Sequence, residues 1–225
     1  MSDTAVIIVS AGKSTRMNGV DKQFAPIGDK TVIETSISAF EKCESVLQII
    51  VVVANENIQK LQAIIDKLEL SKPVTICEGS STRQKSVFSA LEHVDKSAKF
   101  IAVHDGARPL VKPEHIENTI KDARVFGAAV LGVPVKDTIK VCDGGFVKDT
   151  PPRSSLFITQ TPQVFSKRVY FEGVDFALEH NLDFTDDCQL VEAIGTKVYM
   201  TLGDYENIKI TTPEDIKIAQ VMLGY

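Results

Sequence analysis

Residues 5–12 read AVIIVSAG, five apolar positions in a row followed by three small residues. Continuous apolarity is typical of a strand that is covered on both faces, whereas a strand with one face in water alternates polar and apolar positions. Small residues directly after a strand let backbone N–H groups approach a phosphate closely. The stretch therefore predicts a buried strand that ends in a phosphate-binding loop.

Apolar runs of the same kind recur along the chain, and amphipathic segments lie between them. Strands are predicted at 5–9, 49–54, 74–77, 100–103, 128–135 and 197–202. Helices are predicted at 32–41, 56–68, 83–94, 113–125, 167–179 and 186–193, with a closing helix from Thr212 onward. Within 56–68, for example, Ile58, Leu61 and Ile65 recur at helical spacing. The alternation indicates an α/β fold, a three-layer and mostly parallel sheet in a single domain over residues 1–225.

Residues 136–157 interrupt this alternation. Asp143-Gly144-Gly145 stands between two short stretches there, and the Gly-Gly pair supplies the positive φ of a tight hairpin turn. A hairpin at this place has little core of its own, so it either lies across the sheet or packs against another subunit. We favour a protruding β-arm that makes a homodimer, and the alternative is an ordinary surface hairpin.

The composition limits the classes of protein to which the chain belongs. It has 225 residues, 44% of them hydrophobic, and a net charge of −5. This charge argues against a surface that binds nucleic acid or coats a membrane, although a local basic pocket stays open. No apolar run approaches the roughly 18 residues of a membrane span, and the four cysteines form no CxxC pair or Cys/His cluster. We expect a soluble, cytoplasmic protein without a zinc or redox site, with its cysteines as packing residues.

Positive charge follows the small residues of the first predicted strand. Lys13 and Arg16 would add charge to a phosphate site there. Gly12-Lys13-Ser14 suggests part of a P-loop, but that motif needs a glycine where the chain has Ile7. The G-x-G-x-x-G fingerprint of dinucleotide-binding proteins is absent as well. Neither a P-loop protein nor a Rossmann dehydrogenase is indicated.

Polar residues also follow the strand predicted at 100–103, in the stretch His104-Asp105-Gly106-Ala107-Arg108-Pro109. A carboxylate at the carboxyl end of a parallel strand lies where ligands bind. Asp105 could hold Mg²⁺ or a sugar hydroxyl, and Arg108 could anchor a phosphate; the alternative is a strand-end turn closed by an Asp–Arg ion pair. We interpret His104 as a packed histidine, because no second His or Cys completes a catalytic triad.

Further cations stand at loop positions. Lys22 is a candidate partner for charge that develops on phosphorus, with a solvated surface lysine as the alternative. Arg153 follows a Pro-Pro pair and Lys209 precedes the closing helix, while Thr185 could bind a ligand or belong to a helix cap. Cations that recur at the loops of an acidic chain indicate one deep electropositive pocket for a ligand with several phosphates.

The order of these motifs resembles the 2-C-methyl-D-erythritol 4-phosphate cytidylyltransferase family over about residues 5–222. The resemblance rests on Ala11-Gly12-x-x-x-Arg16-Met17, Lys22-Gln23-Phe24, Asp105-x-Ala107-Arg108-Pro109, Gln160-Thr161-Pro162-Gln163 and Asn207-Ile208-Lys209. It implies a glycosyltransferase-A-like nucleotidyltransferase fold, a homodimer with interlocked arms, and Mg²⁺-dependent transfer of CMP from CTP to a polyol phosphate. Ribitol-5-phosphate cytidylyltransferases share most of these motifs and are the alternative within the class. A non-catalytic nucleotide-binding protein is the alternative outside it.

The resemblance also implies roles for individual residues. CTP would be bound by two loops that contain Ala11, Gly12, Lys13, Ser14, Gly79, Ser80, Ser81, Arg83 and Ser86. Among the catalytic residues, Arg16 and Lys22 would stabilise the transition state. Lys209 and the arm residue Arg153 would position the polyol phosphate, with Arg153 acting in the partner's site. Further substrate contacts would be Asp105, Arg108, Thr138, Thr161 and Thr185. Asp105 is also the candidate ligand of a Mg²⁺ ion held mainly by the CTP phosphates.

Three positions depart from the family pattern. Ser10 and Ser14 stand where the family has alanine and glycine, and Gly106 stands where alanine is common. Serine restricts the backbone more than glycine does, but the Ser14 hydroxyl could replace a phosphate contact. These changes bear on substrate affinity more than on the class of reaction.

Overall fold

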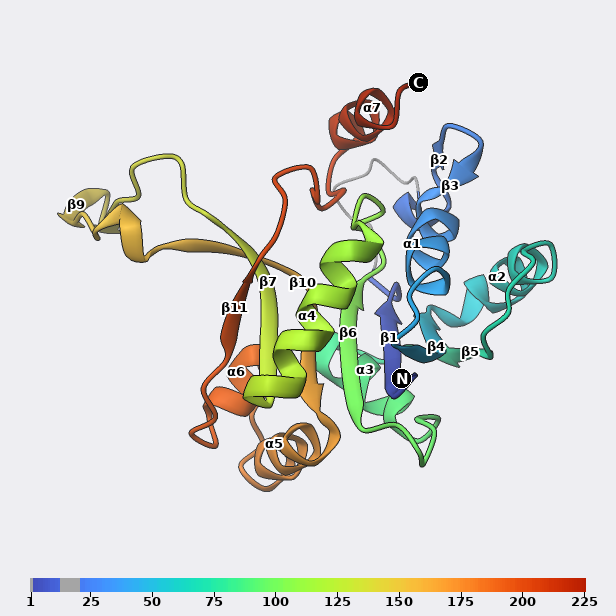
Figure 1. Ribbon diagram of the computed structural model, residues 1–225. Helices are drawn as coiled ribbons and strands as arrows, with labels where there is room; N and C mark the ends of the chain where they lie inside the picture. The colour runs from blue at the N-terminus through green and yellow to red at the C-terminus, as the bar shows by residue number, and fades with distance from the viewer. Residues whose placement is uncertain (1, 13–20) are drawn as a thin grey trace.

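The computed structural model describes residues 2–12 and 21–225, and Figure 1 shows how their helices and strands are arranged. The strands are β1 (Thr4–Val9), β2 (Pro26–Ile27), β3 (Lys30–Thr31), β4 (Val46–Val53), β5 (Val74–Glu78), β6 (Phe100–Asp105), β7 (Ala128–Pro134), β8 (Val141–Asp143), β9 (Phe146–Asp149), β10 (Phe157–Ser166) and β11 (Tyr199–Leu202). The α-helices are α1 (Val32–Glu41), α2 (Ile58–Ile65), α3 (Arg83–Leu91), α4 (Pro113–Phe126), α5 (Lys167–Glu179), α6 (Asp187–Glu192) and α7 (Pro213–Met222). The short 3₁₀ helices are η1 (Lys22–Phe24), η2 (Asn55–Asn57) and η3 (Arg153–Ser155).

A seven-stranded sheet forms the centre of the fold, in the order β11-β7-β10-β6-β1-β4-β5. β1 pairs in parallel with β4 and β6, β4 pairs in parallel with β5, and β7 with β11. β10 lies antiparallel between β6 and β7. The predicted α/β fold with a mostly parallel sheet is therefore confirmed.

Helices cover both faces of the sheet, because successive side chains of each strand point to opposite sides. On one face, Ala5 and Ile7 of β1 share a core with residues of α3, α5 and α6. On the other face, Val6 and Ile8 share a core with residues of α1, α2 and α4, and Figure 1 shows α4 lying along the sheet. All four of these β1 side chains are fully buried, which explains the unbroken apolar run.

Local signals set the ends of two predicted helices. At the start of α1, the Thr31 hydroxyl accepts from the Glu34 N–H, and the Glu34 carboxylate accepts from the Thr31 N–H. At the start of α7, the Asp215 carboxylate accepts from the Thr212 N–H, and Pro213 occupies the first turn. The closing helix therefore begins where the sequence predicts it, and α1 and α5 have the predicted bounds.

The sequence pattern does not predict β10, although this strand has ten residues. The middle of β10 reads TQTPQ, which is polar, whereas the other central strands are apolar. Gln160 and Gln163 of this stretch are buried because they find partners: Gln160 Nε2 donates to the Asp204 carbonyl over 2.7 Å, and Gln163 Nε2 donates to Asp186 Oδ2 over 2.7 Å. Smaller differences are that β4 begins before the predicted residue 49 and α2 ends before residue 68.

The segment 136–157 contains the predicted hairpin. β8 and β9 pair antiparallel around Gly144 and Gly145, whose φ angles of 54° and 86° are the positive values that a tight turn needs. In Figure 1 the hairpin stands away from the sheet rather than across it. Its side chains Phe146 and Val147 are 81% and 60% exposed. The hairpin is therefore a protruding arm with an uncovered apolar surface.

The four cysteines are free thiols. Cys43, Cys77 and Cys188 are buried, as expected of packing residues. Cys142 is exposed on β8, so the packing role is wrong for that residue, because the arm that carries it has no core. Within the described residues, no helix is both long enough and apolar enough to cross a membrane.

Candidate active site

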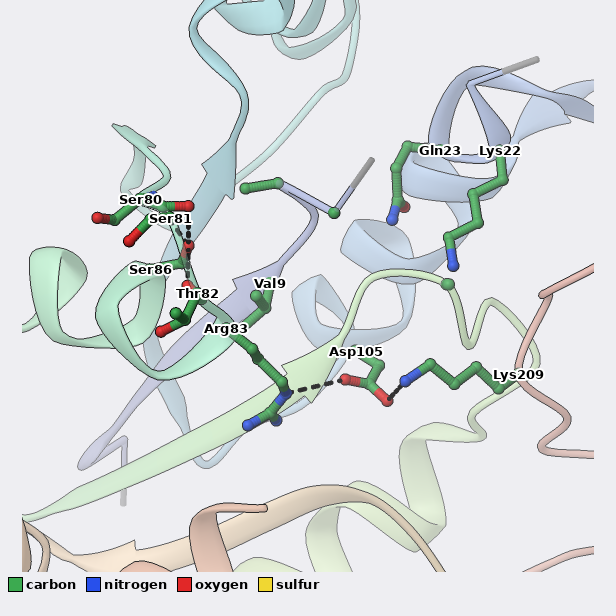
Figure 2. Close-up of a pocket in the computed structure, with 13 residues that line it drawn as sticks. Val9, Lys22, Gln23, Ser80, Ser81, Thr82, Arg83, Ser86, Asp105 and Lys209 are labelled. Atoms are coloured by element: carbon green, nitrogen blue, oxygen red, sulfur yellow. Dashed lines mark hydrogen bonds and ion pairs between the residues drawn. The ribbon is translucent and has the colours of Figure 1, made fainter. Parts of the chain in front are cut away.

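A cavity of about 490 Å³ opens at the carboxyl ends of β1 and β6 (Figure 2). In an open parallel sheet this is the edge at which ligands bind, and the volume suits a small molecule. The walls come from the residues after β1, η1, the loop after β5, the start of α3 and the loop after β6. The described lining residues are Val9, Ala11, Gly12, Lys22, Gln23, Ser80, Ser81, Thr82, Arg83, Ser86, Asp105, Ala107 and Lys209.

The two loops that the sequence assigns to a nucleotide meet beside this cavity. A Cβ atom at Gly79 would lie 2.2 Å from the Cβ of Ala11, so the loops can approach this closely only because residue 79 is glycine. The Gly79 N–H donates to the Val53 carbonyl over 2.7 Å, which holds the second loop at the end of β4. Ala11 and Gly12 line the cavity. Lys13, Ser14 and Arg16 of the first loop lie outside the described residues.

The Ser86 hydroxyl ties the second loop to the start of α3. It accepts from the Ser80 N–H over 2.9 Å and donates to the Thr82 carbonyl over 2.8 Å. Thr82 caps α3, because its hydroxyl accepts from the Lys85 N–H over 3.2 Å. Four of the predicted residues of this second loop, Ser80, Ser81, Arg83 and Ser86, line the cavity, whereas Gly79 is not among its described lining residues.

Asp105 lies between three positively charged side chains. Its Oδ2 is 2.8 Å from Lys209 Nζ and 3.6 Å from Arg108 Nε, and its Oδ1 is 3.6 Å from Arg83 Nε. Figure 2 shows Arg83 and Lys209 approaching the carboxylate from opposite sides. Burial raises the pKa of Asp105, but the ion pairs with Lys209 and Arg83 outweigh burial and hold this pKa well below its usual range. Asp105 is therefore ionised. The Asp–Arg ion pair that the sequence suggested is present, and Asp105 forms two more ion pairs, with Arg83 and Lys209.

Arg83 connects Asp105 to a second carboxylate deeper in the protein. Its Nη1 donates to Asp187 Oδ2 over 2.5 Å, and Asp187 Oδ1 accepts from the Tyr170 hydroxyl over 2.6 Å. Tyr170 is fully buried, and burial together with Asp187 raises the pKa of this phenol, so it stays a donor. The sequence marks Asp187 only as part of a helix start, and it gives no signal for Tyr170.

Hydrogen bonds through His104 hold the loop after β6. The Asp105 N–H donates to the Thr161 hydroxyl over 3.0 Å, and this hydroxyl lies 3.0 Å from His104 Nδ1. His104 Nε2 lies 3.2 Å from the Arg108 carbonyl, which can only accept, so Nε2 carries the proton and Nδ1 accepts from Thr161. Burial lowers the pKa of His104 to about 3, which keeps the ring neutral. The predicted packed histidine is confirmed, and it also fixes the loop between Asp105 and Arg108.

Arg108 and Lys22 both reach the segment that carries Lys209. Arg108 Nη1 donates to the Asn207 carbonyl over 2.8 Å, and Lys22 Nζ donates to the Ile210 carbonyl over 3.2 Å. Lys22 also lines the cavity, which favours a ligand-binding lysine over a solvated surface lysine.

A smaller cavity of about 160 Å³ shares Arg83, Asp105 and Lys209 with the larger one. Its other described lining residues are Arg108, Thr159, Gln160, Thr161, Gln163, Thr185 and Asp186. Four of the five substrate contacts expected from sequence therefore meet in this cavity. Two adjoining cavities that share cations suit two anionic ligands that react where the cavities join.

Two predicted site residues lie apart from both cavities. Thr138 and Arg153 are exposed in the arm segment, and neither is among the described lining residues of these two cavities. Arg153 Nη1 donates to the Lys136 carbonyl over 2.7 Å within that segment. The separation follows from the protrusion of the arm away from the sheet.

The donors for a metal ion are few in the part of the chain that the structure describes. No three His, Cys, Asp or Glu side chains gather there as a metal-binding group. Asp105 is the one carboxylate among the described residues of the larger cavity. A single ionised carboxylate fits Mg²⁺ when ligand phosphates complete the site, since this ion is usually held by one or two carboxylates plus phosphates.

Known proteins resemble the chain over nearly its whole length. Residues 4–225 match the family model described as 2-C-methyl-D-erythritol 4-phosphate cytidylyltransferase. A protein of that name from Caldanaerobacter subterraneus subsp. tengcongensis is 46% identical over 224 residues, which cover 98% of this chain and 99% of the relative. One from Clostridium botulinum is 41% identical over 225 residues, which cover 99% of this chain and 98% of the relative. The crystal structure of 4-diphosphocytidyl-2C-methyl-D-erythritol synthase from Anaerococcus prevotii has a TM-score of 0.89 at 30% identity and covers 100% of this chain and 97% of that chain.

Proposed function

Because the chain belongs to the 2-C-methyl-D-erythritol 4-phosphate cytidylyltransferase family, we propose that its larger cavity binds CTP and its smaller cavity binds 2-C-methyl-D-erythritol 4-phosphate. The protein is a nucleotidyltransferase of isoprenoid precursor synthesis. It transfers CMP from CTP to the polyol phosphate, releases pyrophosphate and forms 4-diphosphocytidyl-2-C-methyl-D-erythritol. The observation that carries the assignment of the cavities is their shared boundary, to which Arg83, Asp105 and Lys209 belong.

The nucleotide is assigned to the two loops that meet beside the larger cavity. Small residues expose backbone N–H groups, and hydroxyl and cationic side chains add donors, which together suit a triphosphate. The close approach of Ala11 and Gly79 supports this assignment, because it brings the two loops together beside one cavity. The residues proposed to bind CTP are Ala11, Gly12, Lys13, Ser14, Gly79, Ser80, Ser81, Arg83 and Ser86.

The reaction needs alignment and cancellation of negative charge. An ionised oxygen of the polyol phosphate attacks the α-phosphorus of CTP and forms a new O–P bond. The bond from this phosphorus to the bridging oxygen breaks, and pyrophosphate leaves with the electron pair. No general base is required, because the attacking oxygen is already ionised. Arg16 and Lys22 are proposed to stabilise the charge that develops on phosphorus. The position of Lys22 in the cavity wall supports this role for Lys22.

The polyol phosphate is assigned to the smaller cavity. Asp105 is ionised and can accept hydrogen bonds from the hydroxyl groups of the polyol. Arg108 and Thr185 offer donors around it, the Thr161 hydroxyl can accept a further hydrogen bond, and Lys209 is proposed to place the phosphate for attack. The position of Lys209 between the two cavities supports this role.

Arg153 and Thr138 are proposed to complete the site of a second copy of the chain. Neither is among the described residues that line the two cavities of its own chain, and the arm that carries them exposes Phe146 and Val147. Contact with another copy would bury this apolar surface and stabilise a homodimer. Arg153 would then reach the polyol phosphate bound by the partner.

Two further properties belong to the proposal. Asp105 would hold Mg²⁺ together with the phosphates of CTP, and the ion would supply further cancellation of phosphate charge. A cytoplasmic location is proposed because reducing conditions keep cysteines as free thiols, the state that all four have here.

Pyrophosphate release from CTP and a magnesium salt by the purified protein tests this function. We expect release with 2-C-methyl-D-erythritol 4-phosphate and none with ribitol 5-phosphate. Release with ribitol 5-phosphate alone would keep the mechanism and change the substrate. A folded protein that binds CTP and releases nothing with either substrate would be a nucleotide-binding protein instead.

A further inference from the structure

Asp187 sets the direction of the Arg83 side chain, although Asp187 is buried and is not among the described residues that line the two cavities. Its Oδ2 accepts from Arg83 Nη1 over 2.5 Å, the short distance of a charge-assisted hydrogen bond. Arg83 Nε, in contrast, lies 3.6 Å from Asp105 Oδ1, which is an ion pair but is too long for a hydrogen bond. The guanidinium group is therefore oriented by Asp187 more than by Asp105.

Asp187 is itself fixed from two sides. Its Oδ1 accepts from the Tyr170 hydroxyl over 2.6 Å, and its N–H donates to Gln163 Oε1 over 3.1 Å. Tyr170 is fully buried in α5, where its ring centre lies 5.2 Å from that of Phe165. Gln163 belongs to β10, so the start of α6 is tied to a helix and to a central strand. A carboxylate held in this way gives Arg83 a partner that does not move.

Arg83 is the residue through which this arrangement reaches the ligands. It begins α3 and lines both cavities, and its side chain is 26% exposed. Figure 2 shows it extending from the start of α3 toward Asp105. Burial lowers the pKa of Arg83, but the charges of Asp187 and Asp105 outweigh burial and raise it, so the group stays charged. A cation fixed before the ligands arrive loses no side-chain freedom during the reaction.

Stability alone does not account for this arrangement. A buried ion pair loses the hydration of both charges, and apolar residues of similar volume are often as stabilising or more so. The pair between Arg83 and Asp187 has a second consequence, because its arginine extends to the boundary that the two cavities share. The orientation of Arg83 at that boundary is the property that apolar residues could not provide.

Building on the proposed function, we propose that Asp187 and Tyr170 are positioning residues for the transfer of CMP. Asp187 directs Arg83 toward the phosphates that react where the cavities join, and Tyr170 holds Asp187 in place. Both residues act through Arg83 and not by contact with a substrate.

Asp187→Asn tests the proposal, because asparagine has nearly the same shape and lacks the charge that holds Arg83. We expect kcat for pyrophosphate release to fall about 10- to 100-fold, the scale for a group displaced by about 1 Å. The KM values for CTP and for 2-C-methyl-D-erythritol 4-phosphate should change less than kcat, since the cation remains and only its direction changes. Steady-state kinetics with each substrate varied in turn measures these constants.

Asp3→Asn is the matched control. Asp3 is also a buried carboxylate paired with an arginine, because it is 7% exposed and its Oδ1 lies 2.6 Å from Arg124 Nη2. It precedes β1, whereas the larger cavity opens at the carboxyl end of that strand. Asp3→Asn should lose stability and keep wild-type kinetics. The control therefore separates the loss of a buried ion pair from the loss of positioning.

A double-mutant cycle shows whether Asp187 acts through Arg83. In an Arg83→Met background, Asp187→Asn should lower kcat no further, because the group that Asp187 directs is gone. A fall by the same factor in both backgrounds overturns the proposal.

Tyr170→Phe keeps the buried ring and both charges, so it decides the question where a charge variant does not fold. We expect kcat to fall about 3- to 10-fold, less than in Asp187→Asn, because the substitution loosens Asp187 without removing its charge. Wild-type kcat in folded Asp187→Asn or in Tyr170→Phe overturns the proposal. A Tyr170→Phe variant that fails to fold also overturns it, because the hydroxyl would then serve folding. A wild-type protein that releases no pyrophosphate would contradict the proposed function itself, which keeps the two failures distinct.

Discussion

Lys209 Nζ lies 2.8 Å from Asp105 Oδ2, and this ion pair joins the segment before α7 to the carboxyl end of β6. The pair lies in the wall that the two cavities share. A fixed carboxylate partner orients the ammonium group, which would otherwise sample many directions in solvent. Orientation of this kind is what a group that places a phosphate for attack requires.

Lys209→Met should therefore raise the KM for the polyol phosphate and lower kcat/KM by about 10²-fold or more, the scale for loss of one well-placed charged donor. Steady-state kinetics with each substrate varied in turn measures the effect. Lys217→Met, at an exposed position of α7, is the control and should keep wild-type kinetics. Equal kinetics for both variants would remove Lys209 from the site.

Lys22→Ala should lower kcat by about 10²- to 10³-fold, because it removes the donor that we propose to act on charge that develops only in the transition state. Rapid-quench measurement of pyrophosphate formation with saturating substrates separates this effect from substrate binding. Lys67→Ala changes an exposed lysine after α2 and should have no effect. Near-normal turnover by Lys22→Ala would contradict the proposed role of Lys22 in stabilising the transition state.

Mixtures of Arg153→Ala and Lys22→Ala chains should recover activity that neither variant shows alone. If Arg153 acts in the partner's site, a hybrid dimer contains one site with both residues intact. Subunit exchange is verified with differently tagged chains. Confirmed exchange without recovery would count against action across the dimer, and a monomer in solution would count against the dimer.

Acid should destabilise the fold through His104. Burial lowers the pKa of His104 to about 3 from an ordinary value of 6.5, so between these values the unfolded chain binds a proton that the folded chain does not. This contribution to stability is complete above pH 6.5 and falls by about 1.4 kcal/mol per pH unit as the pH drops toward 3. Urea unfolding at several pH values between about 7 and 4 measures the slope. His104→Asn cannot titrate in this range and should show a shallower slope; equal slopes would contradict the prediction.

Gly106→Ala should destabilise the protein by about 1–3 kcal/mol, because the new methyl group would lie 2.0 Å from Ser10 Oγ. Ser10→Ala should be nearly neutral, since its hydroxyl has no partner among the described residues. The double variant should recover most of the loss, because removal of the hydroxyl makes room for the methyl group. A double-mutant cycle by urea unfolding measures the coupling, and additive effects would show that the two residues are independent.

Local patterns were sufficient for many elements of this fold. α1 and α5 have their predicted bounds because an amphipathic period marks the body of each helix. The hairpin of the arm follows from Gly144 and Gly145, which allow positive φ. β10 could not be predicted in this way, because its TQTPQ segment is polar and its two glutamines are buried only through partners far away in the sequence, Asp186 and Asp204.

The sequence by itself determined the α/β alternation, the sites of charge at the strand ends, and the order of motifs that marks the family. Each of these depends on residue types at short spacing. Only the tertiary structure decided that Arg83, Arg108 and Lys209 meet at Asp105 and that Asp187 also pairs with Arg83. The physical reason is that ion pairing and desolvation depend on distances across the sheet, and these distances follow from strand order and helix packing rather than from spacing along the chain.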